Sequence, residues 1–473
     1  MVFSSSVFLM AFLPLTLLAY FIVPARLVKV RNAVLLASSL VFYGWGEPKY
    51  IVIMLFSIVF NYASGLVIGK YTGMGNKHRA KPMLVLCVLG NLALLGIFKY
   101  TDFVLDTVNR LTAAGLTLPG IALPIGISFY TFQTMSYIID VYRGKVESQK
   151  NLITFGAYVA LFPQLIAGPI VRYSDVAVML AGRRTNLEQA AEGIRRFIVG
   201  FGKKVLLANQ IYVVWMELSS MENLSAAAAW LGAVAFTFQI YFDFSGYSDM
   251  AIGLGKIFGF DYLENFNYPY ISRSITEFWR RWHMSLSSWF KEYVYIPLGG
   301  NRKGIARQLL NISIVWALTG LWHGASWNFV MWGVYYGIIL IIEKLGLLRI
   351  LEKCPAAIGH VYSLLIIVIG WVIFAVEDLG DVAHYIGMMF GSTGKIADDA
   401  FIYFFESRIW LLIACVIGST PLPKMVCTAA ADILKDKEAL LSVIETLLLM
   451  GIFILSMAFL VSGSYNPFLY FRF

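Results

Sequence analysis

The sequence predicts an all-α, polytopic membrane protein. Of its 473 residues, 59% are hydrophobic, 15% are aromatic and 14% are charged, whereas soluble domains carry roughly 25% charged residues. Apolar runs of about 17 to 25 residues, long enough to cross a hydrocarbon core of roughly 30 Å as helices, recur from end to end. No soluble domain of ordinary size fits between them. Spans are expected, among others, at residues 50–68, 83–98, 361–374, 401–419 and 439–461.

The distribution of lysines and arginines predicts how the chain is oriented in the membrane. The net charge of +9 comes from lysines and arginines in short loops, where they set orientation, so we expect no nucleic-acid partner. The first run, residues 7–24, is expected to remain as a span, because residues 1–6 lack the cations of a cleaved signal peptide. Basic loops at 25–31 and 70–82, placed in the cytoplasm, put the N-terminus outside. The stretch 172–204 is expected to be basic and largely cytoplasmic.

Two apolar segments contain residues that interrupt helices. Residues 124–134 and 162–170 place Pro, Gly and Gln inside apolar runs. Non-helical backbone at membrane depth is tolerated where protein or a water-filled cavity surrounds it. Kinked helices packed through small residues explain either segment alone. The two together favour broken or re-entrant segments that line a cavity.

Two carboxylates, Asp243 and Asp249, lie in strongly apolar surroundings. Each costs roughly 2.5–3.5 kcal/mol to insert at the centre of a membrane helix, which makes it a candidate functional residue. Alternatively, the two pair with arginines of the segment 278–302 and only stabilise the fold. Both interpretations stay open at this point.

Residues 272–296 are predicted to form an interfacial amphipathic helix. Its apolar stripe has three- and four-residue spacing and consists of Phe278, Trp282, Leu286, Trp289 and Tyr293. Tryptophans favour the headgroup level, and the cations Arg280 and Arg281 suit the cytoplasmic face. A turn and a basic loop with Arg302 follow. His283 borders the apolar face.

His323 is predicted at a junction of two spans, in an apolar, glycine-flanked setting. A lone histidine is more often a satisfied core residue than a catalyst. At membrane depth, however, the apolar environment keeps a neutral imidazole available as a general base. His323 could therefore take the proton from an attacking hydroxyl or thiol.

The four cysteines are expected to be reduced packing residues. They are scattered singly, without a CxxC pair or metal-ligand spacing near a histidine. We therefore expect no metal site. The cysteines are Cys87, Cys354, Cys415 and Cys427.

Several motifs resemble the membrane-bound O-acyltransferases, in the order of that family. They are residues 244–249, 278–287, 296–302, 322–328 and the closing 466–471, with 3–5 and 12–14 pointing the same way. The ending at 298–302 is more similar to the alginate O-acetyltransferase branch than to the related D-alanyl transferase for teichoic acid. One departure is Ala375, where family members often carry an arginine, so a donor or cytoplasmic contact of that arginine has no counterpart here.

The resemblance implies a single domain over residues 1–473. N-terminal helices would occupy 1–122, a catalytic core 123–346 and C-terminal helices 347–473. About eleven transmembrane helices, with re-entrant and interfacial helices, would surround a central tunnel. A cytoplasmic funnel would admit the acyl donor, and an outer funnel would admit the acceptor.

The resemblance also implies roles for single residues. It places the catalytic histidine at His323 and a second important histidine at His283. His323 would act as general base and later as general acid, and His283 would position or polarise the donor thioester. The candidate substrate-binding residues are Asp249 and Asp243 as orienting groups, Arg280, Arg281 and Arg302 for an anionic donor, and Trp322 and Asn328 beside His323.

The expected function is O-acetylation of an extracytoplasmic polysaccharide from the bacterial inner membrane. Acetyl-CoA would be the donor substrate, and no tightly bound cofactor is expected. The expected partners are membrane lipid and an exported acetyltransferase subunit at the outer face. The alternatives are D-alanyl transfer to teichoic acid from a carrier protein, and a polysaccharide transporter or channel that uses the broken helices. The transporter has no use for a tryptophan-rich interfacial helix.

Overall fold

The computed structural model describes residues 1–166 and 168–463. Every regular element in this part of the chain is a helix, so the predicted all-α class is confirmed. Seven helices in it are long and apolar enough to cross a membrane, as expected of a multi-pass membrane protein. They are Ile51–Gly73, Lys77–Thr112, Leu187–Ser219, Ala226–Ile257, Ala356–Ala375, Asp399–Gly418 and Glu438–Ser462. The larger number of spans implied by the resemblance stays a prediction, and its closing motif at 466–471 lies outside the described residues.

The chain forms two compact units. The first comprises Met1–Phe197 and Ser248–Leu263, and the second comprises Ile198–Tyr247 and Glu264–Phe473. The division at residues 122 and 346 stays a prediction.

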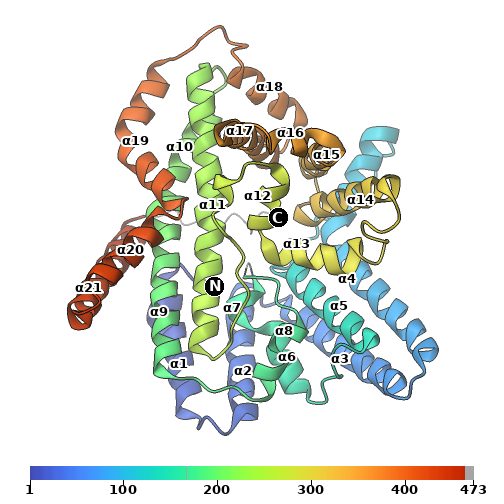
Figure 1. Ribbon diagram of the computed structural model, residues 1–473. Helices are drawn as coiled ribbons and strands as arrows, with labels where there is room; N and C mark the ends of the chain where they lie inside the picture. The colour runs from blue at the N-terminus through green and yellow to red at the C-terminus, as the bar shows by residue number, and fades with distance from the viewer. Residues whose placement is uncertain (167, 464–473) are drawn as a thin grey trace. The chain divides into compact units, whose positions relative to one another are not determined.

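The first unit holds the N-terminal helices (Figure 1). They are α1 (Leu13–Ile22), which continues a π-helical turn at Phe8–Phe12, α2 (Val28–Gly46), α3 (Ile51–Gly73), α4 (Lys77–Thr112), α5 (Ile127–Arg143), α6 (Leu152–Ala160), α7 (Phe162–Leu165) and α8 (Tyr173–Ala181). Buried asparagines join α3 to α4. Asn91 Nδ2 donates to Asn61 Oδ1 at 2.8 Å, and Asn61 Nδ2 donates back at 3.2 Å. Thr134 of α5 also donates to Asn91, so these polar groups find the partners that an apolar surrounding demands.

The two interrupted segments of this unit are irregular only in part, because residues 127–134 of the first segment lie in the regular helix α5. Helix α5 begins only after Gly126, whose φ of +76° is in the left-handed region. The second segment contains the four-residue helix α7, and its Ala167 lies outside the described residues. The segments meet, because a Cβ on Gly126 would lie 2.7 Å from the carbonyl oxygen of Leu165. Whether they line a cavity stays a prediction.

The second unit holds most of the C-terminal half (Figure 1). Its helices are α10 (Asn209–Ser219), α12 (Ile275–Arg281), α13 (Met284–Phe290), α14 (Ile305–His323), α15 (Trp327–Ile342), α16 (Leu348–Leu351), α17 (Ala356–Ala375), α18 (Leu379–Met389), α19 (Asp399–Gly418), α20 (Leu422–Ile433) and α21 (Glu438–Ser462). Helices α9 (Leu187–Gly202) and α11 (Ala226–Ile257) contribute residues to both units.

Helices α14 and α15 cross closely through glycines. A Cβ on Gly320 would lie 2.4 Å from the carbonyl oxygen of Phe329, and one on Gly333 would lie 2.5 Å from that of Trp316. Small residues let two helix backbones approach in this way. The crossing fixes the C-terminal end of α14, where His323 is the last residue.

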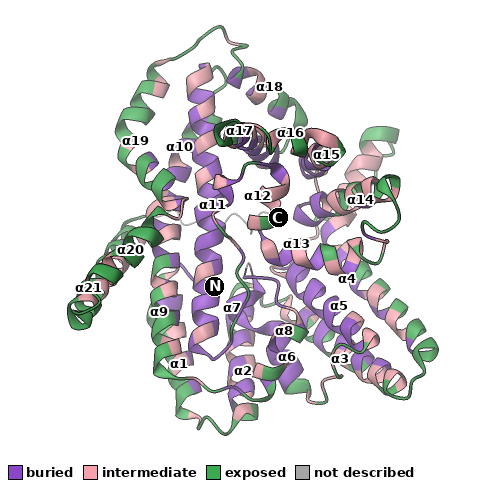
Figure 2. Cartoon of the chain, in the orientation of Figure 1, coloured by how far each residue is buried: buried purple, intermediate pink, exposed green. Residues whose placement is uncertain are grey.

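Burial differs sharply among the helices (Figure 2). Helix α11 is buried along most of its length, whereas α21 is exposed along most of its length. An apolar exposed helix suits contact with lipid chains. All four cysteines are unpaired, as predicted.

The basic segments are more helical than their composition indicated. In the stretch 172–204, α9 continues without a break into α10 as one apolar helix, Leu187–Ser219, and the cytoplasmic location of the stretch stays a prediction. The loop predicted at 70–82 is only a short turn, since α3 extends to Gly73 and α4 begins at Lys77. The helices therefore continue past their purely apolar runs into charged residues.

Candidate active site

The segment predicted as one interfacial helix is broken in two. Helix α12 ends at Arg281, and α13 begins at Met284. His283 between them has a φ of +43°, a left-handed conformation that ends a right-handed helix. The continuous helix over 272–296 was therefore a wrong prediction. Its apolar stripe is nevertheless buried throughout, from Phe278 to Tyr293.

Glu343, which the sequence analysis did not single out, holds the start of α12. Its carboxylate accepts hydrogen bonds from the backbone N–H of Ile275 at 2.6 Å and of Thr276 at 2.8 Å. It also accepts from the hydroxyl of Thr276 at 2.6 Å and from that of Tyr362 at 3.2 Å. Only 1% of Glu343 is exposed. The sequence feature that could have pointed to Glu343 is its position directly after the apolar run 327–342.

His283 is buried with a defined tautomer. It is 1% exposed, and its Nδ1 lies 3.1 Å from Asn265 Oδ1. The backbone N–H of Ser285 donates to the same Oδ1 atom, so that atom is an acceptor and Nδ1 carries the proton. Nε2 is then the unprotonated nitrogen, and no described residue hydrogen-bonds to it. Burial lowers the pKa of His283 to about 3, which keeps the ring neutral.

His323 lies in an aromatic cluster at the end of α14. It is 5% exposed. Its ring centroid lies 5.0 Å from those of Trp322 and Trp332 and 5.4 Å from that of Phe374. Helix α15 begins four residues later, at Trp327, so His323 does lie at the predicted helix junction.

Trp322 connects the two histidines. Its ring centroid lies 6.0 Å from that of His283 and 5.0 Å from that of His323. Residues 40 positions apart in the sequence are therefore brought to one aromatic cluster within the second unit. The tunnel implied by the resemblance stays a prediction.

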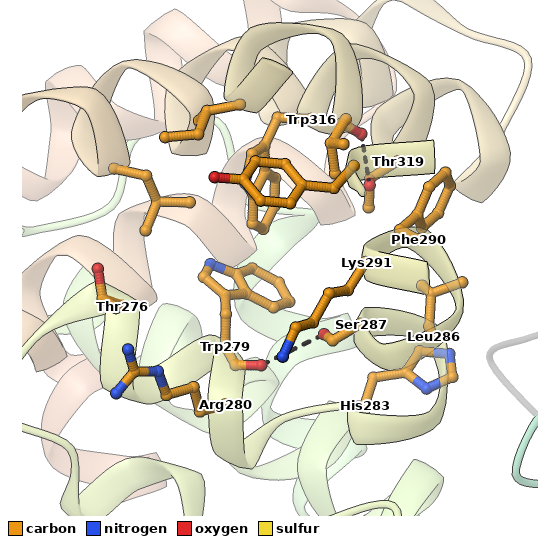
Figure 3. A pocket seen from close by; sticks show the side chains of 14 residues that line it. Thr276, Trp279, Arg280, His283, Leu286, Ser287, Phe290, Lys291, Trp316 and Thr319 are labelled. Carbon is orange, nitrogen blue, oxygen red and sulfur yellow. Dashed lines mark hydrogen bonds between the residues drawn. The ribbon is translucent and has the colours of Figure 1, made fainter. Parts of the chain in front are cut away.

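A pocket of about 330 Å³ opens beside His283 (Figure 3). Apolar and aromatic side chains form most of its wall, among them Trp279, Leu286 and Trp316. Lys291 extends into it toward Trp279 (Figure 3), and Arg280 lies at its edge. His283 lines this pocket, whereas His323 does not appear among its described lining residues. Two cations on an apolar wall suit a ligand with an anionic end and an uncharged arm.

Arg281 and Arg302, the other two arginines predicted to bind the donor, do not line the described part of the pocket. Arg281 is engaged by Glu277, at 2.9 Å, and by the carbonyl of Asn267. Arg302 is exposed in the turn after Gly300 and does not line the described part of the pocket. Of the three, the structure brings only Arg280 to the pocket.

Asn328 joins two helices beside His323. Its side-chain amide donates to the carbonyl of Phe374 at 3.1 Å, and its oxygen accepts from Ser326. These bonds attach the start of α15 to the end of α17, where Ala375 is the last residue. The arrangement favours a positioning role for Asn328.

The two aspartates pair with cations of the helix Leu187–Ser219, not with the predicted arginines of 278–302. Asp243 lies 2.5 Å from Lys204, and each side chain is 1% exposed. Asp249 lies 2.9 Å from Arg196. The predicted partners were wrong, because the cations that face the two aspartates come from the stretch 172–204 and not from the segment 278–302. The structural interpretation of the carboxylates is favoured, and their substrate contact stays a prediction.

The fold and the site together define a multi-pass membrane protein with a buried histidine centre. A family model described as membrane-bound O-acyltransferase matches residues 145–374. The chain is 41% identical to the probable alginate O-acetylase AlgI of Pseudomonas putida, over 100% of both chains. It is 34% identical to the peptidoglycan O-acetyltransferase of Helicobacter pylori, over 83% of this chain and 80% of that one. It is 30% identical to the teichoic acid D-alanyltransferase of Bacillus subtilis, over 46% of this chain and 58% of that one. The chain belongs to the membrane-bound O-acyltransferase family and is an acyltransferase.

Proposed function

We propose that this protein transfers an acetyl group from acetyl-CoA, at the cytoplasmic face of a bacterial inner membrane, toward an extracytoplasmic polysaccharide. The observation that carries the proposal is the pair of buried histidines around Trp322, one of which lines a pocket edged by Arg280 and Lys291. Two relatives that match most of the chain are a probable alginate O-acetylase and a peptidoglycan O-acetyltransferase. Alginate or another surface glycan is the proposed acceptor, reached through an exported acetyltransferase subunit.

His323 acts as the general base in this proposal. The acceptor hydroxyl oxygen attacks the thioester carbonyl carbon, and its proton passes to the neutral imidazole. A C–O bond forms and the C–S bond breaks. The imidazolium then returns the proton to the departing thiolate, which leaves as the free thiol of CoA. The surrounding rings exclude water that would otherwise hydrolyse the thioester.

His283 positions the donor rather than polarising its carbonyl. A carbonyl oxygen needs a hydrogen-bond donor, and Nε2 carries no proton in the tautomer that Asn265 fixes. The lone pair on Nε2 can instead accept a bond from an amide N–H of the donor's pantetheine arm. Arg280 and Lys291 would attract the donor's phosphates.

D-alanyl transfer is the second candidate within the acyltransferases. Its named relative covers less than half of this chain, whereas the acetyl-transferring relatives cover most of it. The alternative that the protein is a polysaccharide transporter predicts flux of polysaccharide in sealed vesicles without an acyl donor. It also predicts no special role for His323.

The test measures acetyl transfer from labelled acetyl-CoA to the exported partner or the polymer, in membranes that hold the full chain. His323→Ala should abolish transfer, because general acid–base catalysis contributes about 10² to 10⁴ in rate. His78→Ala, at an exposed histidine, is the matched control. Size-exclusion profiles establish that both variants fold. Retained transfer by a folded His323→Ala protein would refute the role of His323, and labelling only from D-alanyl carrier protein would refute the acetyl donor.

A further inference from the structure

The first unit holds a cavity that the acyl-transfer chemistry does not use. Its volume is about 460 Å³, within the range of about 300–1,000 Å³ typical of small-ligand sites. The end of α3 and the start of α4 form one wall, through Thr72 and Lys77. The end of α5 and residues 145–150 form the other.

Cations dominate the charge of this cavity. Lys77, Lys145 and Lys150 line it, against a single carboxylate, that of Glu147. Lys145 also lies 4.0 Å from the buried Asp140. Among the described residues, neither Lys77 nor Lys150 takes part in an ion pair, and both are exposed to solvent. Two mobile ammonium groups at the mouth of a cavity can approach phosphate oxygens without first breaking a native contact.

The cavity lies beside the short turn that joins two candidate membrane spans. Helices α3 and α4 are both long and apolar enough to span the membrane, and only residues 74–76 separate them. Their joined ends must therefore lie at one membrane surface. The exposed cations Lys70, Arg79 and Lys81 are at the same helix ends, which is the pattern expected at a cytoplasmic leaflet.

We propose that this cavity binds the phosphate of an anionic phospholipid headgroup. The lysines that line the cavity supply both the positive charge and the hydrogen-bond donors for phosphate oxygens. A free phosphate-bearing molecule would offer the same chemistry from solution. The position at the membrane surface favours the lipid.

The test uses the purified full-length protein in a neutral detergent, with binding followed by native mass spectrometry. The probes are phosphatidylglycerol, zwitterionic phosphatidylcholine and inorganic pyrophosphate. The double variant Lys77→Gln/Lys150→Gln should weaken phosphatidylglycerol binding roughly 25-fold, at about fivefold for each cation near an anionic surface. The matched control is Lys353→Gln/Lys424→Gln, which removes two exposed lysines of the second unit.

Glu147→Gln gives the opposite expectation. Removal of the one lining carboxylate should tighten phosphatidylglycerol binding, an effect that loss of folding cannot produce. Equal binding by the Lys77→Gln/Lys150→Gln protein and its control would overturn the site. Equal affinity for phosphatidylcholine and phosphatidylglycerol would overturn the charge argument. Saturable pyrophosphate binding without phosphatidylglycerol binding would overturn the lipid as the source of the phosphate. Acetyl transfer does not enter any of these measurements.

Discussion

Replacement of Glu343 by alanine should loosen the start of α12 and, with it, the pocket beside His283. The carboxylate accepts the backbone N–H groups of Ile275 and Thr276 at 2.6 and 2.8 Å. These donors belong to the first turn of α12, where no intrahelical partner exists. Thr276 and Arg280, on the same helix, line the pocket.

The size of the effect follows from those bonds. A buried donor left without an acceptor costs about 1–3 kcal/mol, so loss of two such bonds costs roughly 2–6 kcal/mol. Glu343→Gln keeps one acceptor oxygen and should lose about half as much. Glu352→Ala, at an exposed glutamate in the same region, should change little, because surface substitutions stay within about 0.5 kcal/mol.

The assay pairs two measurements. The apparent melting temperature of the purified protein should fall in the order Glu352→Ala, Glu343→Gln, Glu343→Ala. The KM for the acyl donor should rise in the same order, since the pocket wall moves with α12. Glu343→Ala protein with the melting temperature and KM of Glu352→Ala would refute the view that this carboxylate holds the site together.

Three further predictions test a buried histidine, a buried ion pair and a helix crossing. The pKa of His283, lowered to about 3 by burial, lies below its ordinary value near 6.5. The unfolded chain therefore binds the extra proton first, and stability should fall from pH 6.5 toward pH 3, by about 2 kcal/mol at pH 5. The variant His283→Gln should show a flatter profile of melting temperature against pH. Asp243→Asn or Lys204→Met alone should cost about 3–5 kcal/mol, because each removes one charge of a buried ion pair. The double variant should recover most of that loss in thermal unfolding. Gly320→Leu should prevent α14 and α15 from crossing and yield little folded protein by size exclusion. Gly451→Leu, in open space on α21, should fold normally.

Composition and periodicity predicted the fold class because both report directly on burial in lipid. The apolar runs 361–374, 401–419 and 439–461 correspond to α17, α19 and α21 within a few residues. The helix Leu187–Ser219 was missed because Arg196 and Lys204 interrupt its apolar pattern. Those cations face carboxylates, and a sequence does not show which charges will be paired.

The sequence predicted those site residues whose role follows from their residue type and their immediate neighbours. His323 at a junction followed from the glycine and the two apolar runs around it. Asn265 and Glu343 were not predicted, because their roles depend on where distant segments meet. Asn265 lies 18 positions before His283, and Glu343 lies 68 positions after Ile275. No local spacing connects such pairs.

The break at His283 explains how one segment serves both packing and chemistry. In a continuous helix, a residue at the border of the apolar stripe would share the environment of its neighbours one turn away. The left-handed conformation at His283, which histidine tolerates better than most residues, separates α12 from α13 while Trp282 and Leu286 stay buried. The imidazole can then hydrogen-bond to Asn265 through Nδ1, and Nε2 stays available to the pocket.

His283→Asn, which retains a preference for this backbone conformation, should fold like the wild type and yet raise the KM for the donor. His283→Leu should lose stability as well, because the break then costs more. Equal KM values for wild type and His283→Asn would mean that the break serves packing alone.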